Sequence, residues 1–183
     1  MPLVKQQVNS AFPASSSGRY YIGQGLAPVS QSPTQNTILY VPCFVKKDVN
    51  NPILAVDQSG AVATTTQVGI YDGSNGIVNA PLLFSTTLTT SASAAIYTAN
   101  TTVFLKRGFY ILAGVATSAT PTTFRAMSIS GASFEAFGRE TSITTLDANH
   151  QYTETGQSSL PSSIGTITRT SAAGPGVYVF IRY

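Results

Sequence analysis

The residues whose types and spacing come closest to a chemical site lie in the stretch VGIYDGSNG, residues 68–76. Asp72, Ser74 and Asn75 could offer oxygen ligands to a calcium ion. A calcium loop of the helix–loop–helix kind needs further acidic ligands, but the next acidic residue is Glu135. Asp and Asn bond to nearby backbone, and glycine adopts positive φ, so the same residues form a tight turn without an ion. We therefore interpret the stretch as a strand followed by a turn, and we predict no metal site.

A catalytic site can be sketched around His150, the only histidine, with Asp147 and Glu154 nearby in sequence. No Gly-x-Ser-x-Gly motif supplies a serine nucleophile, and one histidine with the single cysteine, Cys43, cannot provide a zinc site of His and Cys alone. The seven acidic residues include no pair that stands out as the two carboxylates of a glycosidase. We expect no enzyme activity and no cofactor.

The elements that must position these residues are nearly all strands. Runs rich in β-branched and aromatic residues alternate with turn sequences such as GSNG, KRG and AAGPG. No window shows an apolar stripe at helical spacing; residues 132–140 come closest, and a glycine interrupts them. The predicted strands are RYYIG, 37–45, 61–72, 82–90, 101–106, 109–117, 122–129, 163–170 and 176–183.

The closing segment GVYVFIRY shows the period of two that a strand requires. Val177, Val179 and Ile181 share one face, and Tyr178, Phe180 and Arg182 share the other. Eight or so strands in one domain without a long helix predict a single antiparallel β-sandwich, of Greek-key or jelly-roll type. We expect a short N-terminal arm at 1–18 and the β-sandwich domain at 19–183.

The composition favours a structural role. Charged residues are only 9% of the chain, against roughly 25% in an average soluble protein, so the surface lacks the charge repulsion that keeps monomers apart. The basic residues are scattered apart from two adjacent pairs, so we expect no nucleic-acid binding. No apolar span is long enough for a membrane, and we expect no signal peptide. Cys43, in an apolar run, is predicted to be a small buried hydrophobe.

Four segments form an ordered set that resembles the jelly-roll domain of phage virion surface proteins, which include capsid decoration, head-fibre, tail-fibre and baseplate proteins. They are GRYYIG (18–23), TILYVPCFV (37–45), VGIYDGSNGIVNAPLLF (68–84) and LKRGFYILAGVATSATPTTFR (105–125). The set spans residues 18–125, about 60% of the chain. The chain departs from the family pattern at Ile111, where Trp is usual, and in a longer polar stretch at 139–162.

The resemblance implies a jelly-roll trimer on the virion surface, assembled in the host cytoplasm. In the leading interpretation the chain is a decoration or cement protein that binds the major capsid protein or another virion protein. The polar stretch at 139–162 would then face outward or cover the next subunit.

The N-terminal arm carries apolar residues that could order on docking to a neighbouring subunit or to the capsid. The alternative interpretation is that residues 1–18 are a disordered terminus. The candidate attachment residues are Leu3, Val4, Val8 and Phe12.

A receptor-binding module that recognises host surface glycans is the alternative function, with Tyr97 and Tyr152 as candidate sugar contacts. A cellular carbohydrate-binding sandwich is a weaker third interpretation. Any single tyrosine is also explained as an ordinary strand residue, half-buried on a sheet.

Overall fold

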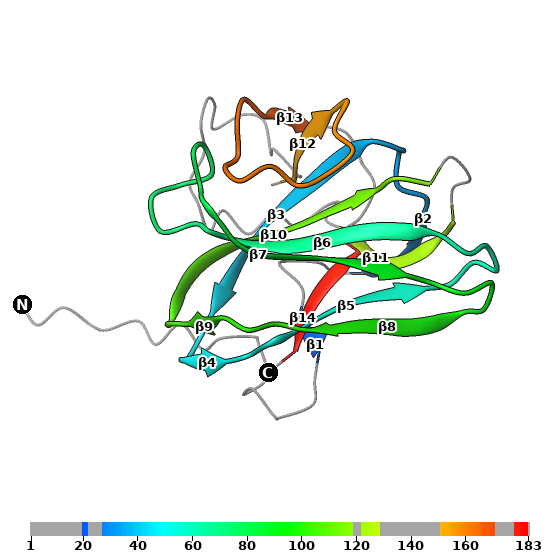
Figure 1. Ribbon diagram of the computed structural model, residues 1–183, viewed down its shortest axis with the longest axis horizontal. Coiled ribbons are helices and arrows are strands. Elements are labelled where there is room, and N and C mark those ends of the chain that lie inside the picture. The colour runs from blue at the N-terminus through cyan, green and yellow to red at the C-terminus, as the bar shows by residue number, and fades with distance from the viewer. Residues whose placement is uncertain (1–19, 22–26, 119–121, 129–150, 171–177, 183) are drawn as a thin grey trace, which may run out of the picture.

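The computed structural model describes residues 20–21, 27–118, 122–128, 151–170 and 178–182. Over these residues the chain is an all-β protein of antiparallel strands (Figure 1). The described part contains no helix that could cross a membrane. The arm at 1–18 and the segment 132–140 lie outside the described residues.

Two six-stranded sheets make up most of the described part of the chain. The β5 sheet contains β1 (Tyr20–Tyr21), β14 (Val179–Arg182), β5 (Ile53–Gln58), β11 (Phe124–Ser128) and β2 (Ala27–Gln31) in that order, with β8 (Ala95–Asn100) also paired to β5. The β3 sheet contains β13 (Thr168–Thr170), β12 (Gln151–Thr155), β3 (Thr37–Val45), β10 (Gly108–Ala116), β6 (Thr65–Asp72) and β7 (Leu82–Thr89). A separate pair joins β4 (Val49–Asn50) to β9 (Phe104–Leu105).

The two sheets share one hydrophobic core. The β3 sheet contributes alternate residues of β3 and its neighbours, and the β5 sheet contributes residues of β5, β11 and β14. Only every second residue of such a strand enters the shared core, because successive strand residues point to opposite faces of the sheet. Core side chains include Leu39, Val41, Val68, Leu112, Leu54, Val56, Phe124 and Ile181.

The β3 sheet is also buried on its outer face. Ile38, Tyr40, Ile111 and Val115 point away from the shared core and form a second cluster with residues from distant parts of the chain. Burial on both faces explains why TILYVPCFV and FYILAGVA are nearly continuous apolar runs rather than alternating ones. Pro42 lies beyond the part of β3 that pairs with β12, so its missing N–H breaks no β12–β3 hydrogen bond.

Several predicted strands agree with the structure and others do not. The prediction for 37–45 is confirmed, and the one for 109–117 is confirmed to within a residue at each end. The strand expected at 61–72 begins only at Thr65, and that at 163–170 is confirmed only for its last three residues. Of 101–106 only Phe104 and Leu105 are strand. Strands β2, β4, β5, β8 and β12 were not predicted.

The alternation predicted for the closing segment holds within β14 but is wrong at Tyr178. Tyr178 precedes the strand and turns into the shared core, where its ring stacks on Phe124 with centroids 5.0 Å apart. It reaches β10 at Gly114, where an added Cβ would lie 2.8 Å from the tyrosine oxygen. Glycine is therefore needed at this position for the two sheets to approach so closely.

Candidate interaction surfaces

The outer face of the β3 sheet is covered by residues 156–164, here called the cover segment. Leu160 and Ile164 bury their side chains in the second cluster. The segment is also bound to the sheet through its backbone: Leu82 N–H donates to Ser162 O at 2.9 Å, and Ile164 N–H donates to Ala80 O at 3.0 Å. The Tyr71 hydroxyl donates to the carbonyl of Pro161 at 2.8 Å.

Gly69, in the middle of β6, is the position on which the cover segment rests. A Cβ there would lie 2.6 Å from Leu160 Cδ1 and 2.8 Å from Phe84 O, closer than real Cβ atoms approach. Leu160 also donates its backbone N–H to Gln67 Oε1 at 2.7 Å. A glycine within a strand marks a close approach of another segment, and here that segment is the cover.

A small polar network closes one edge of this covered face. The Tyr40 hydroxyl donates to Glu154 Oε2 at 2.9 Å, and the Gln157 side-chain amide donates to Glu154 Oε1 at 2.9 Å. Burial and the hydrogen bond to Glu154 raise the pKa of Tyr40 above its ordinary value. Burial also raises the pKa of Tyr71, whose ring meets that of Tyr40 edge-on at 5.7 Å.

The described part of the polar stretch at 139–162 therefore covers its own subunit. Strand β12 pairs with β3, and the cover segment follows it onto the sheet. Within 151–162 the polar side chains of Ser158, Ser159 and Ser162 are exposed, so this part of the stretch faces outward while it packs on its own sheet. Contact with the next subunit stays a prediction. The rest of the stretch, including His150, lies outside the described residues.

The stretch DGSNG forms the turn that the sequence predicted. Asp72 Oδ1 accepts the backbone N–H of Ser74 at 2.9 Å, and Gly76 takes a φ of 101°. Gly76 N–H also donates to Gly73 O at 3.0 Å. Within the described part of the chain, no group of three or more His, Cys, Asp or Glu side chains could hold a metal ion.

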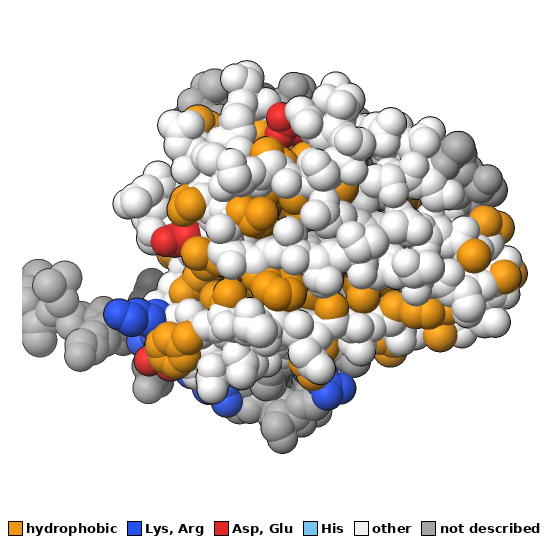
Figure 2. All heavy atoms as spheres, viewed as in Figure 1, with side chains coloured by type: hydrophobic (Ala, Val, Ile, Leu, Met, Phe, Trp, Pro, Cys, Tyr) orange, Lys and Arg blue, Asp and Glu red, His pale blue; other side chains and the backbone are white. Residues whose placement is uncertain are grey.

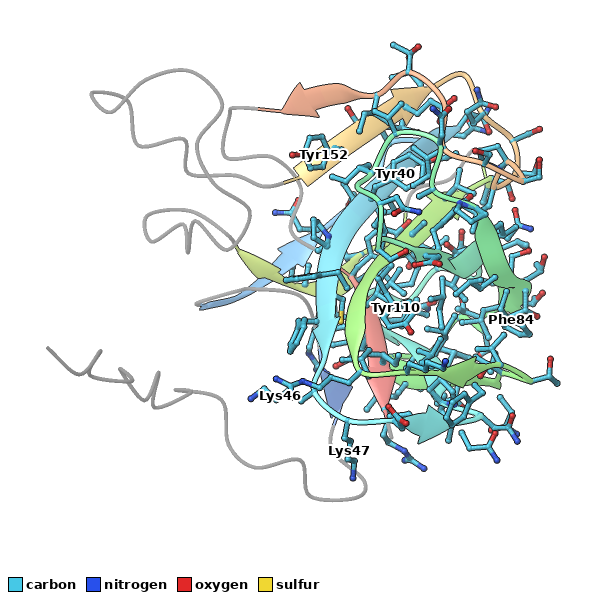
Figure 3. All side chains as sticks on the ribbon, turned by 90° about the vertical axis from the view of Figure 1, so that its left-hand side faces the viewer. Tyr40, Lys46, Lys47, Phe84, Tyr110 and Tyr152 are labelled. Atoms are coloured by element: carbon cyan, nitrogen blue, oxygen red, sulfur yellow. The ribbon has the colours of Figure 1, made fainter. Side chains whose placement is uncertain are left out.

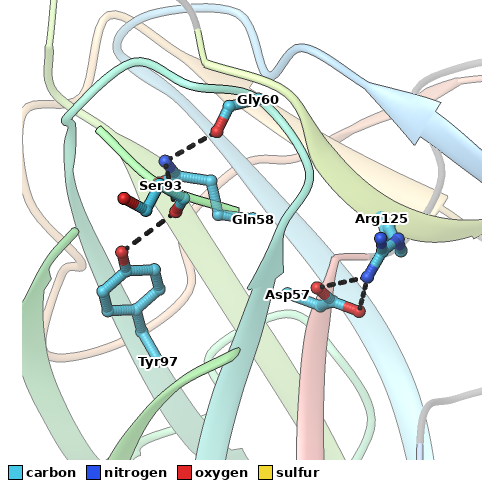
Figure 4. Close-up of polar contacts among 6 residues, drawn as sticks. All are labelled: Asp57, Gln58, Gly60, Ser93, Tyr97 and Arg125. Carbon is cyan, nitrogen blue, oxygen red and sulfur yellow. Dashed lines mark hydrogen bonds and ion pairs between the residues drawn. The ribbon is translucent and has the colours of Figure 1, made fainter. Parts of the chain in front are cut away.

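One end of the molecule, here called the neutral tip, consists of the loops at 59–64 and 90–95. Both loops converge on the buried side chain of Gln58, whose Nε2 lies 2.8–3.3 Å from four backbone carbonyls, those of Gly60, Val62, Ser91 and Ser93. Figure 4 shows Gln58 with Gly60 and Ser93. Because an amide nitrogen has only two hydrogens, these contacts share them. The exposed side chains of the tip are uncharged: Ala61, Val62, Ala63, Ser91, Ala92, Ser93, Ala94 and Ala95.

Tyr97 stabilises the same tip through its hydroxyl group and its ring. Its hydroxyl accepts the backbone N–H of Ser91 at 3.0 Å and donates to Ser93 O at 3.1 Å (Figure 4). Its ring packs against the shared core. Beside the tip, Arg125 Nη1 contacts both carboxylate oxygens of Asp57, at 3.1 and 3.2 Å.

The opposite end, here called the basic–aromatic end, carries Phe44, Lys46, Lys47, Phe104, Lys106, Arg107 and Phe109. The Phe44 and Phe109 rings have centroids 4.8 Å apart, and the Arg107 guanidinium lies 6.0 Å from the Phe44 centroid. Figure 3 shows Lys46 and Lys47 projecting from this end, well apart from Tyr40 and Tyr152. The two basic pairs, which looked scattered in the sequence, therefore lie at one end of the molecule.

The structure does not bring the two candidate sugar-contact residues together. Tyr97 lies on β8 and packs against the shared core, whereas Tyr152 lies on β12 and packs against the second cluster. The candidate attachment residues Leu3, Val4, Val8 and Phe12 lie outside the described residues. Cys43 is buried as predicted, and burial raises the pKa of its thiol to about 12.

Sequence reasoning missed Gln58, Gly69 and the convergence of the two basic pairs. Gln58 is one of many uncharged polar residues, and nothing in its neighbourhood distinguishes a buried amide. For the basic–aromatic end a signal was present: FVKK at 44–47 and FLKR at 104–107 share the pattern of Phe, an aliphatic residue, Lys and a second cation.

Comparison of the chain with protein-family models, with curated proteins and with solved structures finds no match.

Proposed function

We propose that the chain is a jelly roll folded as a single sandwich. A jelly roll is a long hairpin of eight strands, paired first with eighth, second with seventh, third with sixth and fourth with fifth, wrapped into two sheets. Strands β2, β3, β5, β6, β7, β8, β10 and β11, taken in that order, form the four pairs β2·β11, β3·β10, β5·β8 and β6·β7. Wrapping should then place the eighth strand beside the third and the seventh beside the fourth. The pairings β11·β5 and β10·β6 agree with this.

On this fold we propose a structural role: a non-enzymatic phage virion protein that decorates or cements the capsid surface as a homotrimer. The observation that carries the proposal is the position of the resemblance. Its three longer segments contain β3, β10, Val68–Asp72 of β6 and Leu82–Phe84 of β7, which are adjacent strands of one sheet in the order β3-β10-β6-β7. The last segment also contains Leu105 of β9 and Phe124–Arg125 of β11, and GRYYIG contains β1, all outside that sheet. Most of the strand residues that carry the resemblance therefore belong to one contiguous unit.

The physical character of the described surface supports the same role. Loops at the neutral tip are held by part-buried hydrogen bonds from Gln58, and the outer face of the β3 sheet is covered by the chain itself. Few charges oppose close contact between neighbouring subunits, as a densely occupied shell requires. Among the candidate sugar contacts, the Tyr97 hydroxyl is engaged within its own tip, which lends no support to the glycan-binding alternative.

Two measurements on the full chain test this proposal. Quantitative mass spectrometry of gradient-purified particles should detect the chain at a fixed copy number relative to the major capsid protein. Sedimentation equilibrium of the purified chain should give three times the monomer mass. Absence of the chain from particles would overturn the virion role, and a stable monomer at high concentration would overturn the trimer.

A further inference from the structure

The two FVKK-like segments meet at one end of the molecule because of strand register. Val45, at the end of β3, pairs with Gly108 at the start of β10, so Lys46 and Lys47 leave the sheet where Lys106 and Arg107 enter it. Val45 and Leu105 are fully buried. Each segment therefore anchors its aliphatic residue in the core and carries a phenylalanine and two cations beside that anchor.

This end exposes large aromatic side chains that a monomer would normally bury. Phe44 is 41% exposed, Phe109 is 39% exposed and Phe104 is 56% exposed. They are the only exposed phenylalanines among the described residues. Clustered exposed apolar side chains with a polar rim are typical of protein–protein contact sites.

The charge of this end is as distinctive as its apolar surface. Among the described residues of this end, four cations stand against two carboxylates, Asp48 and Asp72, which leaves a local excess of two positive charges. Both carboxylates accept backbone N–H groups: Asp48 Oδ1 accepts that of Arg107, in the facing loop, at 2.8 Å, and Asp72 Oδ1 accepts that of Ser74, in its own turn, at 2.9 Å. On the face drawn in Figure 2, blue and red side chains lie together at the left-hand end, further blue lies along the lower edge, and the right-hand end shows neither colour.

We propose that the basic–aromatic end is the surface by which the subunit docks, and that its partner is an acidic protein surface bearing apolar side chains. The inference rests on the proposed virion role and gives the subunit a direction, with the neutral tip pointing away from the particle. Charge complementarity selects the acidic partner, and three phenylalanines without hydrogen-bonding groups select apolar protein contacts.

The same observations disfavour a nucleic acid at this site. Stacking of a base needs an open aromatic face, but Phe44 is flanked by the Phe109 ring and by the Arg107 guanidinium.

The test is rebinding of the purified full chain to particles from which it has been stripped, measured by co-sedimentation. Lys46→Gln with Lys47→Gln removes two positive charges, and Phe44→Ser removes one exposed ring. The matched control is Ala63→Glu with Ala92→Glu at the neutral tip, which changes the net charge by the same amount. Each variant is first compared with the wild type in thermal unfolding. If a variant unfolds early, Lys106→Gln and Phe104→Ser replace it.

We expect the double lysine variant to bind about ten-fold more weakly, Phe44→Ser at least about ten-fold more weakly, and the tip control within about two-fold of the wild type. Added salt should weaken particle binding by the wild type more than particle binding by the double lysine variant.

If native particles carry the chain but the wild type and the variants rebind equally well to stripped particles, the proposed docking surface is overturned and the virion role is not. An equal loss in the tip control would also overturn the docking surface, since net charge would then be responsible. Competition by a short DNA duplex as effective as that by stripped particles would point to nucleic acid and overturn the acidic-protein partner. Absence of the chain from particles would overturn the proposed function and this inference together.

Discussion

Gly69→Ala is the sharpest test of how the cover segment is held. A methyl group at this position would lie 2.6 Å from Leu160 Cδ1 and 2.8 Å from Phe84 O, so Leu160 must move off β6. Overpacking and partial exposure of Leu160 together cost about 2–3 kcal/mol. Replacing glycine returns about 0.5–1 kcal/mol of backbone entropy. We expect the free energy of unfolding to fall by about 1–2.5 kcal/mol, measured by urea denaturation followed by circular dichroism.

Two further variants make this prediction specific. Gly108→Ala is the matched control, because an added Cβ there meets nothing closer than 4.0 Å; its stability should stay within about 0.5 kcal/mol of the wild type. In a Leu160→Ala background the Cδ1 obstacle is gone, so the cost of Gly69→Ala should fall by about 1 kcal/mol. The packing of Leu160 on Gly69 would be refuted if Gly69→Ala left the free energy of unfolding unchanged, or lowered it equally in both backgrounds.

Three other predictions concern buried groups. Gln58→Met should lower the free energy of unfolding by about 2–4 kcal/mol and speed hydrogen exchange in both tip loops, because several part-buried carbonyls lose their donor; unchanged exchange there would contradict it. Cys43 should resist a thiol reagent such as DTNB at pH 8 until the protein unfolds, because burial raises its pKa to about 12; fast labelling of the native chain would contradict this. Burial raises the pKa of Tyr40 and Tyr178 above the unfolded value of about 10, so their contribution to stability is complete below pH 10 and is lost as pH rises further. Absorbance at 295 nm should show them ionising together with unfolding, and ionisation of all nine tyrosines near pH 10 in a folded chain would refute it.

The strands that could be predicted from sequence are those whose composition alone requires burial. TILYVPCFV and FYILAGVA belong to the sheet that is covered on both faces, so their apolar runs are unambiguous. The DGSNG turn was predictable for a local reason as well, since its Asp72 bond spans only two residues.

The missed strands depend on contacts between distant segments. Strand β12, QYTET, is polar and becomes a strand because the edge of β3 accepts it. Strand β8, AIYTAN, is largely exposed and is positioned by six paired residues of β5. Tyr178 breaks the alternation because Gly114, 64 positions earlier, leaves room for its ring. No local pattern could report these pairings.

The candidate surfaces were predictable only in part. The two basic pairs are visible in the sequence, but their convergence depends on the β3·β10 register and on the β4·β9 pair. Gln58 gains its role from two loops more than 30 residues apart, as its bonds to Gly60 and Ser91 show.

The proposed virion role is tested most directly by electron microscopy of purified phage particles labelled with gold-conjugated antibody raised against the full chain. We expect gold over the surface of the head. Gold confined to the tail would contradict the capsid-decoration role in favour of receptor binding, and particles without gold would contradict the virion role altogether.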